Sequence, residues 1–167
     1  SYMEVDRLDK AKVVLGEALT ISQTIENKSV EGSALNNLAD IAIREGNPEL
    51  LKGYAEKSLL IHREINSMEG IAISTRCLAI YYLHQKDFAK ANEYSLAALK
   101  ITDEYEFLLE KSQCLKTLSS IAFARQNFVA GYAYLLQSQK LDGQIFNESL
   151  AEKESSLKIK YETEKKE

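Results

Sequence analysis

Like residues recur every forty positions along this chain, and this period constrains the fold more than any other feature. Leu38, Leu78 and Leu118 are separated by forty residues. Further sets follow the same step: Tyr54, Tyr94 and Tyr134; Ile61, Ile101 and Leu141; and, one unit earlier, Ala18, Leu19 and Ile21 against Ala98, Leu99 and Ile101. A period of roughly 20 to 50 residues is typical of structural units that stack and share one core. We therefore predict three full units, preceded by the second half of another.

Within a unit, the apolar residues recur at helical spacing. Ile71, Thr75, Leu78 and Tyr82 follow three- and four-residue steps, which place them on one face of a helix. A polar corner follows at residues 85–87, and a second helical stretch begins after it. One proline and seven glycines are too few for a chain of short strands and turns. The pattern predicts an all-α fold, a right-handed α-solenoid of about eight helices built from helix–turn–helix units.

Small residues fall where two helix axes must approach closely. They form two series: Ala39, Ala79 and Ser119 on the first helices, and Ala11, Ala91 and Gly131 on the second helices. Leu51 interrupts the second series, so a local repacking is expected there. At the corner between the first two helices of a unit, Gly46 can adopt left-handed backbone. Pro48 then suits the first turn of the next helix, where its missing N–H is harmless.

The period divides the chain into five segments. They are residues 1–29, the second helix of a truncated unit; residues 30–66, 67–106 and 107–148, the three full units; and residues 149–167, a charged exit helix. In the exit segment, Leu150, Leu157 and Tyr161 lie near heptad spacing among many Glu and Lys residues. This pattern predicts the start of a coiled coil or signalling linker, and the alternative is a solvated tail after the last unit.

The units resemble tetratricopeptide repeats (TPR). The residues that carry the resemblance are Leu78-Ala79 with Tyr82, Phe88 with Ala91, and Ala98-Leu99. The spacing is similar to that of the longer subclass, with about forty residues per unit, which spindle-orientation adaptors and kinesin light chains use. The chain departs from the pattern at Ala42 and Ala122, where an aromatic residue is usual, and at Gly131, where alanine is usual. The resemblance covers residues 6–146 and implies a module that recognises proteins or peptides.

The end of the chain resembles a second group of proteins. Residues 157–167 are similar to the segment that leaves the repeats in Bacteroidetes-type TPR sensor histidine kinases and TPR-containing transcriptional regulators. In those proteins a charged helix continues to a membrane span, and a kinase or DNA-binding regulator domain follows. The resemblance implies the sensory region of a two-component signalling protein in an extracytoplasmic, periplasmic location; without it, a cytoplasmic location is expected.

The sequence offers little for catalysis. His62 and His84 lack partners at metal-ligand spacing, and no glycine-rich phosphate loop occurs. Cys77 and His84 are seven residues apart, about 10 Å along one helix, which is too far for a nucleophile and its base. We expect Cys77 and Cys114 to be small buried residues. The prediction is therefore that the chain is not an enzyme and binds no cofactor or metal.

Charge and hydropathy argue against two classes of partner, nucleic acids and membranes. The formal net charge is −4, and no cluster of basic residues gives the footprint that nucleic acid requires. No stretch approaches the roughly 18 apolar residues of a membrane span. We therefore expect no nucleic acid and no membrane contact within these residues. The expected partner is a protein or peptide.

A row of polar residues marks the candidate site. In a TPR array the first helices line a concave groove, and Asn36, Arg76 and Lys116 would lie side by side along it. Such a row suits the amides and carboxylates of an extended peptide. Asn37 matches the position where the family often places a peptide-binding asparagine. The other candidates are Asp40, Ile73, Ile80, His84, Gln113 and Ser120. The alternative is that these residues form a solvated helix face.

Three functions are compatible with these features. The leading one is a non-catalytic peptide- or protein-binding module, the sensory or scaffold region of a larger bacterial signalling protein. The alternative is a structural spacer or dimerisation element that feeds a coiled coil and forms a homodimer through the C-terminal helix. A less favoured one is an intracellular peptide-pheromone receptor, which would need a closed superhelix and an effector domain.

Overall fold

The computed structural model describes the backbone of residues 2–164 and the side chains of residues 7–159 and 161. This part of the chain folds into seven helices and no strand. The helices are α1 (Tyr2–Thr24), α2 (Lys28–Glu45), α3 (Pro48–Glu64), α4 (Met68–His84), α5 (Phe88–Glu104), α6 (Leu108–Ala124) and α7 (Phe128–Glu164). The predicted all-α repeat solenoid is confirmed.

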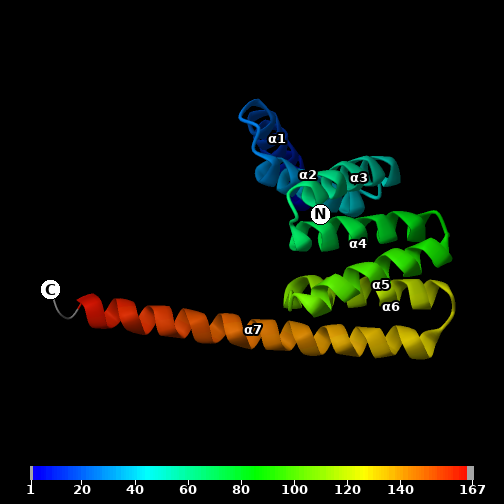
Figure 1. The fold of residues 1–167 in the computed structure, drawn as a ribbon. Helices are drawn as coiled ribbons and strands as arrows, with labels where there is room; N and C mark the ends of the chain where they lie inside the picture. The colour runs from blue at the N-terminus through cyan, green and yellow to red at the C-terminus, as the bar shows by residue number, and fades with distance from the viewer. Residues whose placement is uncertain (1, 165–167) are drawn as a thin grey trace.

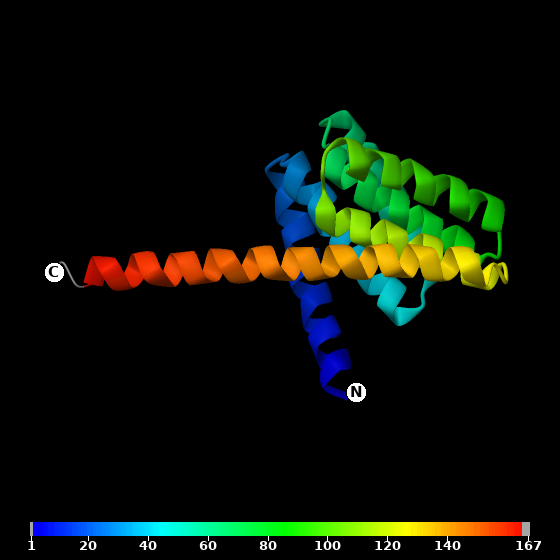
Figure 2. The ribbon, with the colours of Figure 1, turned by 90° about the horizontal axis from the view of Figure 1, so that it is seen from below.

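The helices stack in chain order. Each helix packs against the next, and α2 with α4 and α4 with α6 are also in contact (Figure 1). The first helices of the three units therefore form one layer, and the second helices α3, α5 and α7 form the other. Helix α7 runs well past the body of the stack (Figure 2). A single pair of helices leaves an apolar face uncovered, so each unit depends on its neighbours for its core.

A left-handed residue ends the helix at every corner. These residues are spaced twenty apart: Glu26, Gly46, Asn66, Lys86, Glu106 and Gln126, with φ between 53° and 66°. At most corners the next residue caps the following helix, as when Asn47 accepts a hydrogen bond from the Leu50 N–H. Pro48 occupies the first turn of α3, as expected.

Small residues allow the helices to approach closely. Ala39, Ala79 and Ala91 are fully buried. A Cβ added at Gly131 would lie 2.7 Å from the Phe123 ring, so only glycine leaves room for this large neighbour. Leu51, which interrupts the small-residue series, packs inside the core cluster with Ala39.

The number of helices differs from the prediction of about eight. Helix α7 is 37 residues long and continues without a break through the segment expected to form a separate exit helix. The next corner would fall twenty residues after Gln126, at Phe146, but the backbone there stays helical. The division of the chain into the five predicted segments stays a prediction.

Two glycines form a matched test of the corner geometry. Neither Gly46 (φ 66°) nor Gly53, inside α3, has an atom within 4 Å of an added Cβ. We expect Gly46→Ala to lower the free energy of unfolding by about 1 kcal/mol, because alanine is strained in left-handed backbone. Gly53→Ala should raise it by about 0.5–1 kcal/mol, because alanine favours the helix. Urea denaturation measures both; equal effects would contradict the corner geometry.

Candidate binding groove on the first helices

The first-helix layer carries a hollow where α2, α4 and α6 meet. This central hollow has a volume of about 280 Å³. Six of the ten predicted site residues line it: Asn36, Asn37, Asp40, Ile73, Arg76 and Gln113. Arg44, Leu109 and Glu110 complete it, and the sequence reasoning had missed Leu109 and Glu110. The structure thus brings together residues from three units, although their role in binding stays a prediction.

Two further hollows adjoin the central one. A side hollow of about 300 Å³ lies between α2, the end of α3 and the start of α4. An apolar hollow of about 500 Å³ lies between α1 and α2. Asn37 lines all three hollows. We call the three together the groove, with Asn37 at the point where they meet.

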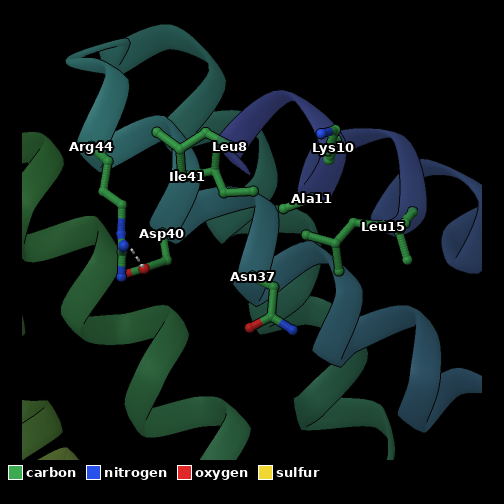
Figure 3. A pocket seen from close by; sticks show the side chains of 9 residues that line it. Leu8, Lys10, Ala11, Leu15, Asn37, Asp40, Ile41 and Arg44 are labelled. Carbon is green, nitrogen blue, oxygen red and sulfur yellow. Dashed lines mark hydrogen bonds and ion pairs between the residues drawn. The ribbon is translucent and has the colours of Figure 1, made fainter. Parts of the chain in front are cut away.

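The apolar hollow was not predicted from the sequence. Helix α1 contributes Leu8, Ala11 and Leu15, and α2 contributes Asn37 and Asp40 (Figure 3). The signal was present as the three- and four-residue steps between the α1 residues. It was overlooked because α1 was treated only as half of a truncated unit.

Asn36 lies in a buried polar cluster and not in an exposed row as expected. Its side-chain carbonyl accepts hydrogen bonds of 2.8 Å from the hydroxyls of Ser58 and Ser74. Its amide nitrogen lies 3.4 Å from the Gly70 carbonyl and 3.3 Å from Nε2 of His62. These contacts tie α2, α3 and α4 together. The side chain of Asn36 is 6% exposed, so its polar groups serve the fold.

His62 forms the inner wall of this cluster. Its ring fills the space between Gly32 and Gly70, where any side chain in place of either glycine would collide with it. Nδ1 is buried and has no hydrogen-bond partner among the described residues. Burial lowers the pKa of His62, against the smaller opposing effects of the Gly32 carbonyl and Glu69. The imidazole is therefore neutral near pH 7, and its role is structural.

Lys116 is also occupied inside the protein. Its Nζ lies 2.8 Å from a carboxylate oxygen of Asp142 on α7. The Ser112 hydroxyl donates a second hydrogen bond of 2.5 Å to the same carboxylate. The bonds from Lys116 and Ser112 lower the pKa of Asp142. Lys116 thus joins α6 to α7 and lies outside the three hollows, which corrects its expected place in the groove.

Arg76 differs from Asn36 and Lys116, its counterparts at forty-residue steps, in having no partner among the described residues. It is half-buried in the central hollow and makes no ion pair or hydrogen bond with the residues that the structure describes. Asn36 and Lys116 each have a partner on a second helix, His62 and Asp142. At forty-residue steps the position that corresponds to His62 and Asp142 is Thr102. Thr102 is fully buried and donates its hydroxyl to the Leu99 carbonyl of its own helix. Thr102 carries no charge to pair with Arg76, and the structure shows no hydrogen bond between the two side chains.

The charges in the central hollow balance. Arg44 pairs with Asp40 at 3.1 Å along α2 (Figure 3). Arg76 and Glu110 bring one further charge of each sign, and neither is paired with a described residue. Asn37 is exposed, and its amide has no hydrogen-bond partner in the described part of the chain. A hollow with free donors and acceptors and no net charge suits a peptide backbone.

Besides Lys116, three predicted residues lie outside the groove. Ile80 is half-buried and packs against the core. His84 is exposed in the last turn of α4. Ser120 is exposed and donates its hydroxyl to the Lys116 carbonyl, one turn back on α6. None of the three lines the hollows described above.

The two cysteines are buried, as expected. Burial raises the pKa of the Cys77 thiol and raises that of Cys114 to about 12, against a smaller opposing effect of Arg76. Both are therefore protonated near neutral pH, and a thiol is a poor nucleophile. Within the described residues, no three His, Cys, Asp or Glu side chains are grouped to hold a metal ion. The same residues include no helix long and apolar enough to span a membrane.

The pH dependence of stability tests the neutral His62. As the pH falls below about 6.5, the unfolded chain binds a proton that the folded chain resists, because the folded pKa is lowered. The contribution of the neutral His62 to the free energy of unfolding is therefore largest above that pH. It decreases as the pH falls toward the folded pKa, by at most about 1.4 kcal/mol per pH unit. Urea denaturation from pH 7.5 to 5.5 should show this slope in the wild type and in His84→Gln. A slope that persists in His62→Gln would contradict the assignment.

Comparisons with known proteins give a fold and no family. No family model matches the chain, and no curated protein matches it. Among solved structures, the chain is similar to the crystal structure of BtubC (BKLC) from P. vanneervenii, with a TM-score of 0.66 and 21% identity. The match covers 86% of this chain and 60% of that one, so the chain spans about three fifths of that structure's length. At this identity, the likeness shows a helical repeat fold.

Proposed function

We propose that this chain is a non-catalytic module of the tetratricopeptide type that binds an extended peptide or protein segment in the groove. The proposal rests on the observation that the side chains of Arg76 and Asn37 make no hydrogen bond or ion pair with the described residues. Both are polar, both line the central hollow, and neither has a partner among the described residues. Helical repeat folds commonly serve as interaction scaffolds with extended concave surfaces.

The groove supports a specific kind of ligand. The planar guanidinium of Arg76 matches a carboxylate with two parallel hydrogen bonds. The Asn37 amide both donates and accepts, as a peptide backbone requires. The apolar hollow, with Leu8, Ala11 and Leu15, offers room for an apolar side chain. We therefore propose a ligand segment with an acidic group and an apolar residue beside it.

A role in signalling would follow from the link between α6 and α7. Helix α6 contributes to the groove, and Asp142 of α7 binds Lys116 and Ser112 of α6. A ligand that shifts α6 would act on this contact and so displace α7. In this proposal the chain is the sensory region of a larger bacterial signalling protein, and α7 passes on the change.

Peptide selection tests the proposal. The purified chain is panned against a random-peptide library, and enriched peptides are titrated against Arg76→Gln and against the matched control Arg63→Gln, an exposed arginine of α3. Loss of a charge-assisted hydrogen bond should weaken binding to the Arg76 variant about ten- to a hundredfold. The Arg63 variant should bind nearly as the wild type does, because Arg63 lines none of the three hollows. No enriched peptide, or equal binding by wild type and Arg76→Gln, would contradict the proposal.

A further inference from the structure

Helix α7 carries an exposed apolar stripe beside the face that packs on α6, and one member of the stripe, Tyr132, also contacts the Phe123 ring of α6. Its six members are separated by three, four, seven or ten residues, which are helical steps of three and four or sums of them: Val129, Tyr132, Leu136, Phe146, Leu150 and Leu157. Each is between 46% and 86% exposed. At 100° per residue they fall within an arc of about 100°. Gly131 and Ser138, which are buried against α6, lie outside this arc.

The spacing of the stripe indicates a helical partner. Single exposed apolar residues are normal on a protein surface, whereas several along one side of a helix are not. The six members occupy positions of a seven-residue repeat whose other positions hold Gln139, Gly143 and Lys153. Such a repeat favours a partner helix wound around α7 as in a coiled coil. The stripe begins on the half of α7 that packs on α6 and continues onto the half that projects beyond the body (Figures 1 and 2). No stripe residue lines the groove.

We propose that the stripe binds the α7 helix of a second copy of this chain in antiparallel orientation, with the two-fold axis near residue 148. In this register Phe146 packs against Leu150 of the second copy, and Leu150 against Phe146. Leu157 lies opposite Gln139, and Gly143 leaves room for the long stem of Lys153. This register thus brings residues 139–157 of the two α7 helices together.

Charge favours this orientation over the parallel one. Lys140 and Glu154 flank the stripe, and neither is paired with a described residue. In the antiparallel register Lys140 lies two residues, about 3 Å along the helix axis, from the level of Glu154 of the second copy, which its long side chain can span, and this pair occurs twice per dimer. In a parallel pair, Lys153 would face Lys153 of the second copy inside the stripe, where like charges repel. The antiparallel pair avoids this repulsion and satisfies the flanking charges.

Sedimentation of the whole chain tests the association. The wild type should form a dimer, and Leu150→Glu should sediment as a monomer with unchanged helical circular dichroism. Leu60 on α3 is a matched control, because it is 70% exposed and lies off the stripe; Leu60→Glu should remain a dimer. A monomeric wild type at 100 µM, roughly the upper range of weak specific association, or a dimer unaffected by Leu150→Glu, would overturn the proposal.

A charge exchange tests the orientation. Lys140→Glu and Glu154→Lys should each raise the dimer dissociation constant about five- to tenfold, because each replaces two attractive contacts with repulsive ones. The double variant should restore the wild-type value. A double variant as weak as the single ones would overturn the antiparallel register. Peptide binding by the monomeric Leu150→Glu variant separates this proposal from the proposed function, because the groove lies on other helices.

Discussion

The groove depends on which side chains of the second helices, at positions 62, 102 and 142, bind polar side chains of the first helices. His62 and its neighbours hold Asn36 inside the core, and Asp142 holds Lys116 against α7. Thr102 turns its hydroxyl to its own helix and leaves Arg76 without a partner. The same structural position is thus used twice to fix one helix against another and once to leave a cation free. A buried polar group without a partner is costly, so the cluster around Asn36 stabilises the stack. The Lys116–Asp142 pair is 41% and 42% exposed and contributes less.

This arrangement connects the fold with the proposed function. The buried cluster around Asn36 sets how α2 and α4 lie against each other, and the same two helices frame the central hollow. The asparagine next along the chain, Asn37, points to the other side and lines all three hollows. One asparagine therefore supports the scaffold while its neighbour faces the ligand. At the far end, Asp142 ties the first-helix layer to α7, whose exposed stripe offers a second, separate surface.

The sequence predicted the helices well because their determinants are local and repeated. Apolar steps of three and four residues, and a corner every twenty residues, leave little choice of fold. The candidate site was predicted less well, since a forty-residue register places residues in a row without showing which of them are paired. Asn36, Arg76 and Lys116 look equivalent by position. They are distinguished only by their contacts, or lack of contacts, with the residues at positions 62, 102 and 142. Helix α7 continues without a break at Phe146, where the twenty-residue period would place a further corner.

The most direct test of this account compares the free energies of unfolding of Asn36→Ala and Arg76→Met. Methionine retains the apolar stem of arginine and removes its charge. If Asn36 is a structural residue and Arg76 is free, Asn36→Ala should lose about 2–3 kcal/mol, because it leaves buried groups unsatisfied. Arg76→Met should remain within about 0.5 kcal/mol of the wild type. Equal losses in the two variants would show that Arg76 has a partner within the protein, and the account of the groove would be wrong.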